Sequence, residues 1–156
     1  MKKIFTIIII TTLIFFIISL YLLNIKINTT KSMPIGIYQT YNNDIILPGD
    51  IVIFEYKNVS FIKKVIAVAG DYIEIKNSQV FVNHKPINNS QIFKFDRNHN
   101  PLPNLSFSRI LNNNEIFALG EHINSFDSRY FGVLDIKKNN VKKAKEILTW
   151  SNNEKR

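Results

Sequence analysis

Apolar residues run without a charged interruption from position 4 to position 23, and short apolar stretches broken by polar positions follow. An apolar run of about 20 residues is long enough to cross the hydrocarbon core of a bilayer as a helix. Residues 1–23 are therefore predicted to form a cytoplasmic tip and a transmembrane anchor. Residues 24–156 are predicted to form one extracytoplasmic domain.

The pattern after position 24 is typical of β-strands. Runs rich in Ile, Val, Phe and Tyr alternate with turn signals, such as Pro48-Gly49-Asp50, and Asn77-Ser78 connects two runs as a hairpin would. This spacing favours a mainly β, antiparallel domain preceded by one N-terminal transmembrane helix. The expected strands cover residues 51–54, 61–69, 72–75, 79–82, 115–119 and 130–134.

Two segments are less regular. Residues 83–113 are rich in Asn, Pro and Ser and are expected to form loops. Near the end, the spacing of Val141, Ala144 and Ile147 suits a helix, whereas Leu148-Thr149-Trp150 suits a closing strand. The pattern alone leaves both structures open for this last segment.

Charges around the apolar run indicate its orientation. Lys2 and Lys3 precede it and favour a cytoplasmic N-terminus, although Lys26 and Lys31 on the far side reduce the asymmetry. No cleavage site of the Ala-x-Ala kind follows the run, so an uncleaved anchor is favoured over a removed secretory signal. We expect a single-pass protein of the cytoplasmic (inner) membrane with its domain in the periplasm or at the outer face.

Composition narrows the possible chemistry. The chain of 156 residues has no Cys, which excludes disulfides and thiolate catalysis. His84, His99 and His122 lie in expected loops without the spacing of metal ligands, so neither a metal nor a cofactor is expected. The net charge of +8 would attract anionic membrane lipid. The basic residues are scattered without interleaved aromatics, so nucleic acid is not an expected partner.

The segment Thr30-Lys31-Ser32-Met33-Pro34 carries a candidate nucleophile. Met33 precedes proline and is pushed toward an extended conformation, which would place Thr30 and Ser32 on the same face. The Ser32 hydroxyl could then attack a carbonyl while the Thr30 hydroxyl and a backbone N–H bind the oxyanion. Taken alone, the segment fits a polar linker between anchor and domain better.

Two lysines interrupt the apolar run of residues 61–68. Alternation puts Lys63 on one face of the strand and Lys64 on the other, and both have apolar neighbours. A lysine can act as a general base when burial lowers its pKa and keeps the amine neutral. The alternative is a lysine that extends along a sheet edge into solvent. The alternation of the strand does not show which of the two lysines, Lys63 or Lys64, is the buried one.

A third segment, residues 124–132, contains Ser125, Asp127 and Arg129. Asp127 and Arg129 could form an ion pair that fixes this loop. Ser125 could hydrogen-bond a neutral lysine amine and orient it, as the third member of a triad orients its base. The alternative is a salt-bridged turn between two strands.

Taken in order, Ser32-Met33-Pro34, residues 61–71 (FIKKVIAVAGD) and residues 125–132 (SFDSRYFG) resemble the type I signal peptidase family, whose members are membrane-anchored serine proteases with a Ser/Lys dyad. Within it, residues 32–38 (SMPIGIY) and residues 96–103 (DRNHNPLP) are closest to the TraF-type conjugative-transfer peptidases. The resemblance extends from about residue 28 to about residue 132. Residues 120–123 (GEHI) depart from the Gly-Asp-Asn that often precedes the last motif.

The resemblance implies a role for each candidate residue. Ser32 matches the nucleophile, Lys63 the general base, and Thr30 the hydroxyl that assists the oxyanion hole. Ser125 matches the serine that contacts the base. The acid and the arginine of the last motif are matched by Asp127 and Arg129.

The resulting hypothesis is a membrane-anchored Ser/Lys endopeptidase. It would process preproteins with a signal sequence, or pilin precursors, at the membrane surface during conjugative transfer or secretion. The family leads us to expect small residues before the cleaved bond. Two alternatives remain: a Ser/Lys protease that acts mainly on itself, and an anchored β-domain that binds secretion components without catalysis.

Overall fold

The computed structural model describes residues 2–42 and 45–150. The last six residues of the expected domain therefore lie outside the described residues. The described chain forms α1 (Lys2–Leu22), β1 (Ile25–Asn28), β2 (Ile35–Tyr41), β3 (Ile51–Tyr56), β4 (Val59–Ala67), β5 (Tyr72–Lys76), β6 (Gln79–Val82), β7 (Lys85–Pro86), β8 (Ser108–Ile110), β9 (Glu115–Leu119), α2 (Ser128–Phe131), β10 (Leu134–Asp135) and β11 (Lys142–Trp150).

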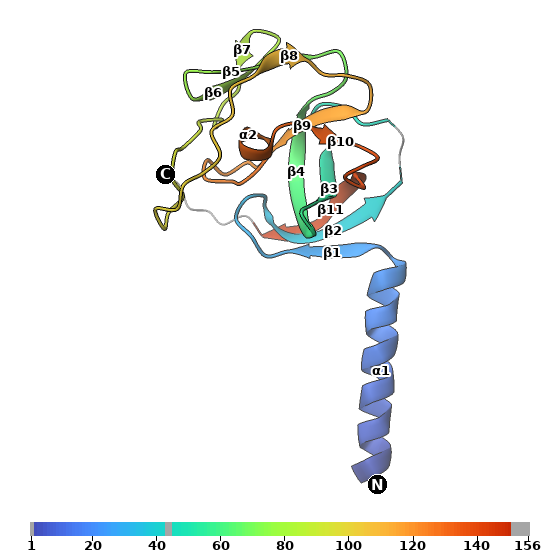
Figure 1. The fold of residues 1–156 in the computed structure, drawn as a ribbon. Coiled ribbons are helices and arrows are strands. Elements are labelled where there is room, and N and C mark those ends of the chain that lie inside the picture. Colours follow the sequence, from blue (N-terminus) through green and yellow to red (C-terminus); the bar gives the residue numbers. More distant parts are fainter. Residues whose placement is uncertain (1, 43–44, 151–156) are drawn as a thin grey trace.

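Helix α1 stands apart from the β domain, and none of its side chains is buried (Figure 1). Its 21 residues extend about 31 Å at 1.5 Å per residue, and its length and composition are those of a membrane-spanning helix. The chain passes from the helix into β1 without a flexible linker. The Thr40 N–H donates to the Asn24 carbonyl at 3.0 Å, and Gln39 Nε2 donates to the Leu23 carbonyl at 3.1 Å.

The strands of the described ranges form two antiparallel sheets. The larger has seven strands in the order β1-β2-β11-β3-β4-β9-β10, and the smaller has four in the order β7-β6-β5-β8. Strand β1 lies at the edge of the large sheet and begins just beyond the end of α1 (Figure 1). The mainly β, antiparallel fold with one N-terminal apolar helix is confirmed.

Within the described part of the domain, buried apolar side chains form three groups. One lies under the centre of the large sheet and includes Phe54 and Ile116. A second includes Phe117 from the large sheet and Ile73 from the small one, so it joins the two sheets. The third contains Met33, which fixes the predicted nucleophile segment to the core.

Most of the predicted strands are confirmed. Strands β3, β4, β5, β6 and β9 cover the expected runs to within a few residues. Asn77 and Ser78 form the turn of the β5–β6 hairpin, and their φ angles of 52° and 56° are those of a two-residue turn that matches the twist of its strands. Asn tolerates this left-handed conformation better than most residues.

The predicted strand at residues 130–134 is wrong. The chain instead forms the short helix α2 and then the two-residue strand β10. The carboxylate of Asp127 caps the helix by accepting the Arg129 N–H at 3.1 Å, and Gly132, at φ 83°, ends it. The aromatic and β-branched residues here favoured a strand, but the cap and the positive φ of Gly132 determine the local structure.

The structure also shows what two less regular segments form. Residues 83–113, expected to be loops, contribute the short strands β7 and β8 to the small sheet. The final segment forms strand β11, which pairs with β2 on one side and β3 on the other. Val141 precedes this strand, and a register shift between Glu146 and Leu148 interrupts the alternation at Ile147, so the apolar residues of the segment are not spaced two apart.

Candidate active site

Ser32 lies in a turn between β1 and β2, and the side chain of Asn28 holds this turn from within. Asn28 Nδ2 donates to the carbonyls of Thr30, Met33 and Pro34 at 3.0, 3.1 and 2.9 Å. Its Oδ1 accepts from the N–H and the hydroxyl of Thr30 at 3.1 and 2.9 Å. Sequence reasoning missed Asn28, because a polar residue at the end of a strand carries no periodic signal.

The predicted extended conformation of this segment is wrong. The chain bends at Thr30 and turns over Lys31 and Ser32, so alternation along a strand does not set the side-chain directions. The two hydroxyls nevertheless meet, since Thr30 Oγ1 lies 3.2 Å from Ser32 Oγ. The contact comes from the Asn28-bonded turn rather than from a shared strand face.

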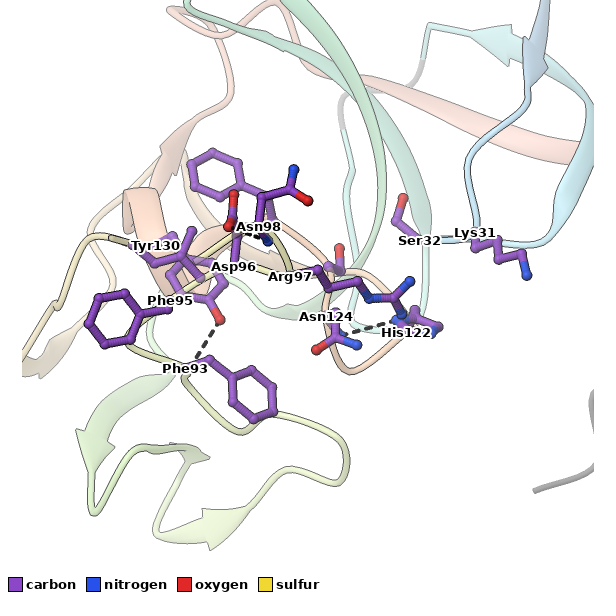
Figure 2. Close-up of a pocket in the computed structure, with 13 residues that line it drawn as sticks. Lys31, Ser32, Phe93, Phe95, Asp96, Arg97, Asn98, His122, Asn124 and Tyr130 are labelled. Carbon is purple, nitrogen blue, oxygen red and sulfur yellow. Dashed lines mark hydrogen bonds between the residues drawn. The ribbon is translucent and has the colours of Figure 1, made fainter. Parts of the chain in front are cut away.

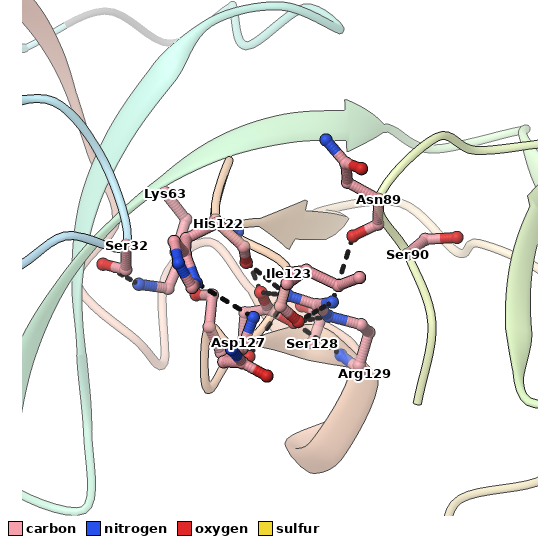
Figure 3. Close-up of polar contacts among 12 residues, drawn as sticks. Ser32, Lys63, Asn89, Ser90, His122, Ile123, Asp127, Ser128 and Arg129 are labelled. Carbon is pink, nitrogen blue, oxygen red and sulfur yellow. Dashed lines mark hydrogen bonds and ion pairs between the residues drawn. The ribbon is translucent and has the colours of Figure 1, made fainter. Parts of the chain in front are cut away.

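Lys63 is the lysine that faces Ser32. Its side chain, on β4, is 2% exposed, and its Nζ donates to Ser32 Oγ at 3.0 Å (Figure 3). The amine also lies over the Phe61 ring, 5.4 Å from the centroid. Burial lowers the pKa of Lys63 from its usual 10.5 to about 8, while Asp127 raises it and Arg129 lowers it. A substantial neutral fraction is therefore available near pH 8.

Lys64 points to the opposite side of the strand. Its amine lies 3.5 Å from Glu121 Oε1, and both side chains are about half exposed, at 48% and 49%. The Lys64 amine therefore faces Glu121 rather than Ser32, and it is not placed to take a proton from the Ser32 hydroxyl.

The end of β9 closes the site from the other side. The N–H groups of Glu121 and His122 donate to the Ser32 carbonyl at 2.8 and 3.4 Å. This contact depends on Gly120, because a Cβ there would lie 2.1 Å from Ser125 Oγ and 2.8 Å from the Ser32 carbonyl oxygen. A glycine at this position lets β9, the Ser32 turn and the Ser125 loop approach one another.

Replacing Gly120 by alanine is expected to destabilise the domain by about 1–3 kcal/mol, because the added methyl group overpacks a buried junction. The measurement is chemical unfolding of the full chain in detergent, followed by the fluorescence of Trp150. Gly70→Ala is the matched control, since φ at Gly70 is +90° but nothing lies within 4 Å of its missing Cβ. That variant should lose only about 1 kcal/mol from backbone strain. Equal losses in the two variants would show that Gly120 is not sterically required.

Asp127 and Arg129 form an ion pair that is fully buried, with both side chains 0% exposed. Asp127 Oδ2 accepts from Arg129 Nη2 at 2.7 Å and from the Gly120 N–H at 2.8 Å. The guanidinium also donates to backbone carbonyls of two loop segments (Figure 3), namely those of Asn89, Gln91, His122, Ile123 and Ser125. The predicted pairing is confirmed, and it organises the loop rather than contacting Ser32.

The predicted contact between Ser125 and Lys63 is not formed. Ser125 is 3% exposed, and its Oγ has no hydrogen-bond partner within the described residues. It lies against the open face of Gly120, while the Lys63 amine bonds Ser32 instead. Both Ser125 and Lys63 still line the same pocket. An unpaired buried hydroxyl is costly, which is a common feature of functional sites.

Two hollows meet at Ser32. The first, about 600 Å³, is lined by aromatic residues and by the loop around Arg97 (Figure 2). The second, about 550 Å³, is lined by β4 from Val59 to Lys63 and by the Asn28–Thr30 segment. Ser32, Asn124, Ser125 and Phe126 line both hollows. An extended chain that crosses Ser32 would therefore occupy one hollow on each side.

Among residues 2–42 and 45–150, no three His, Asp or Glu side chains gather closely enough to hold a metal ion. The reactive groups that the fold does bring together are the Ser32 hydroxyl, the Lys63 amine and the Thr30 hydroxyl.

A serine hydroxyl bonded to a buried lysine amine is the arrangement expected from the resemblance to signal peptidases. Comparison with known proteins agrees: residues 1–150 match the signal peptidase family, peptidase S26, and the chain belongs to this family.

Among individual relatives, the chain is similar to two plasmid transfer proteins TraF of Escherichia coli. One is 29% identical over 83% of this chain and 86% of its own, and the other is 28% identical over 83% and 85%. A signal peptidase I from Enterococcus faecalis V583 aligns in three dimensions with a TM-score of 0.41 and 18% identity, over 69% of this chain and 100% of its own. The predicted resemblance to the family and to its TraF-type members is confirmed.

Proposed function

We propose that this protein is a membrane-anchored serine endopeptidase that cleaves protein precursors at the membrane surface in conjugative transfer. The observation that carries the proposal is the 3.0 Å contact between Ser32 Oγ and the buried amine of Lys63. Its similarity to TraF supports the context of plasmid transfer. Helix α1 supports an anchored, single-pass arrangement with residues 24–156 outside the cytoplasm.

In the proposed mechanism, neutral Lys63 accepts the proton of Ser32 as the serine oxygen attacks the scissile carbonyl. The Ser32 N–H, which has no partner within the described residues, and the Thr30 hydroxyl bind the oxyanion. The C–N bond then breaks as Lys63 passes the proton to the leaving amine. Water or an incoming amine, deprotonated by Lys63, then attacks the acyl carbon. The bond from that carbon to Ser32 Oγ breaks, and Lys63 returns the proton to the serine oxygen.

Thr30 must reorient for this role. Its hydroxyl donates to Asn28 Oδ1 at 2.9 Å, so its proton points away from Ser32. Rotation onto the oxyanion leaves Asn28 Oδ1 with its second donor, the Thr30 N–H. The rotation therefore exchanges one hydrogen bond for another, to an oxygen that carries charge only in the transition state.

The remaining predicted residues position these groups. We propose that Ser125 orients the Lys63 amine once substrate closes the pocket that both of them line. Asp127 and Arg129 hold the loop that carries Ser125. Strand β9 pairs with β4 only from Lys64 onward, so residues 59–63 of β4 have no strand partner on that edge among the described residues. The substrate segment before the cleaved bond can therefore add to this edge as a further strand.

The test uses the purified full chain in lipid vesicles with candidate precursors that carry a signal sequence, and mass spectrometry of the products. Cleavage by the wild type and its loss in Ser32→Ala would support the proposal. Ser106→Ala, an exposed loop serine, is the control. Cleavage of every precursor by the Ser32→Ala variant would contradict the proposal, and processing of the enzyme alone would favour the self-acting alternative.

The rate of cleavage should depend on pH through Lys63. Only the neutral amine accepts a proton, and its pKa is lowered to about 8 by burial. Below pH 8, kcat/KM should rise about tenfold per pH unit, and it should level off above pH 8. A profile that is flat between pH 6 and 9 would rule out a lysine base of this kind.

A further inference from the structure

The hollow of about 600 Å³ on the far side of Ser32 differs in character from the one along β4. Apolar side chains form its walls, including Phe93, Phe95, Phe126 and Tyr130. Arg97 reaches across Asn124 and His122 toward the end that Ser32 lines (Figure 2). A ligand segment here would meet these apolar walls, the guanidinium of Arg97 and, beside Ser32, Lys31.

The loop that carries Arg97 is held in shape by its own hydrogen bonds. The carboxylate of Asp96 accepts from the Asn98 N–H at 2.8 Å and from the backbone and side chain of Asn100 at 2.8 and 2.9 Å. These bonds hold the pKa of Asp96 below its usual value. At the base of the loop, Leu102 N donates to the Lys94 carbonyl at 2.9 Å. The tip is therefore preorganised.

The guanidinium of Arg97 takes part in none of these contacts. No hydrogen bond or ion pair with another described residue engages it, in contrast to Arg109 and Arg129, which each pair with a carboxylate. Both oxygens of the adjacent Asp96 are already occupied within the loop. Arginine presents a planar set of donors that matches a carboxylate with two parallel hydrogen bonds.

The two hollows have different requirements. The acyl part of a substrate must stay bound while it is attached to Ser32, and the strand edge of β4 offers several main-chain hydrogen bonds for that purpose. The leaving part must depart before deacylation. The hollow below Arg97 is therefore the place for the leaving segment.

We infer that Arg97 selects substrates whose leaving segment carries a carboxylate within a few residues of the cleaved bond. This inference rests on the proposed function. The carboxylate has two possible sources, an Asp or Glu side chain and the free C-terminus of a short leaving segment. Both present the same pair of oxygens to the guanidinium.

The experiment compares peptide pairs with the full-length enzyme in detergent. In the first kind of pair, the two peptides differ only by Glu or Gln at one position after the cleaved bond, and both have an amidated C-terminus. Separate pairs place this residue at the first, second, third or fourth position after the bond. A second pair has a short neutral leaving segment that ends in a free acid or an amide. A third pair carries Glu or Gln before the bond. The variant is Arg97→Gln, and Lys94→Gln, an exposed cation outside the hollow, is the control.

For the wild type, we expect kcat/KM to be roughly tenfold higher for the acidic member of the first or second pair, as a charge-assisted bidentate contact would give. In Arg97→Gln this ratio should fall to near one, while Lys94→Gln should keep it. The pair that responds identifies the source of the carboxylate. A wild-type ratio near one in both pairs, a ratio that survives in Arg97→Gln, or a preference found only before the bond would overturn the inference. If no peptide is cleaved in a Ser32-dependent way, the proposed function itself fails, and this inference fails with it.

Discussion

Replacing Lys63 by methionine is expected to abolish cleavage at every pH and, near neutral pH, to make the folded protein more stable. The amine is buried at 2% exposure beside Ser32 and has no substitute among the neighbouring side chains that the structure describes. Methionine has a similar length and no charge, so it can fill the same space. Loss of the proposed base would leave Ser32 without a group to accept its proton.

The gain in stability follows from the depressed pKa. A fall from 10.5 to about 8 means that burial penalises the ammonium form by about 3 kcal/mol, which a lost hydrogen bond to Ser32 offsets by about 1 kcal/mol. Below pH 8 the lysine is charged in both the folded and the unfolded state, so the wild type bears the full penalty. Between pH 8 and 10.5 the unfolded state binds more protons, so the stability of the wild type rises with pH. The advantage of Lys63→Met should therefore shrink over this window, as measured by chemical unfolding.

Lys64→Met is the matched control for this substitution. Lys64 is exposed and makes only a 3.5 Å ion pair with Glu121, so the stability should change by less than about 1 kcal/mol and cleavage should persist. If Lys63→Met still cleaved precursors while Lys64→Met did not, the base would be Lys64 and the proposed mechanism would be wrong.

Replacing Arg129 by methionine is expected to destabilise the domain by about 3–5 kcal/mol, the range found when one member of a buried ion pair is removed. The variant would leave the Asp127 carboxylate unpaired at 0% exposure and five backbone carbonyls without their donor. Because this pair holds the Ser125 loop, cleavage should fall with stability. Urea unfolding of the full chain in detergent measures the loss.

Arg109→Met provides the comparison. Its guanidinium is 38% exposed and pairs with Glu115 at 2.7 Å, so solvent screens the interaction and the loss should stay near 1 kcal/mol or below. A loss in Arg129→Met no larger than that in Arg109→Met would mean that the buried pair does not hold the loop.

Local patterns predict most of the strands and the segments that form the site. Alternation placed one lysine inward but could not say which, because Lys63 and Lys64 have apolar neighbours on both faces of β4. Their roles separate only when the Ser32 turn reaches the Lys63 amine on one face of β4, while Lys64 meets Glu121 on the other. That arrangement depends on strand order in the sheet, which residue spacing does not specify.

Other features of the site depend on contacts that sequence spacing does not reveal. Asn28 holds the Ser32 turn through five hydrogen bonds to nearby backbone and hydroxyl groups, yet a lone Asn has no distinguishing pattern. Residues 130–134 have strand propensity, but the buried pair of Asp127 and Arg129 selects a helical turn there. Tertiary contacts override local propensity at such positions.

The junction between α1 and the sheet has a consequence for how the enzyme would be oriented. Backbone and side-chain bonds from β2 fix Leu23 and Asn24, so the helix and the catalytic groups would rotate as one body. One residue inserted into α1 would rotate Ser32 by about 100° around the helix axis. An insertion of seven residues is close to two full turns and would bring Ser32 back to nearly the same side of the helix. The number of residues in α1 would thus encode the side from which a membrane-held precursor must approach.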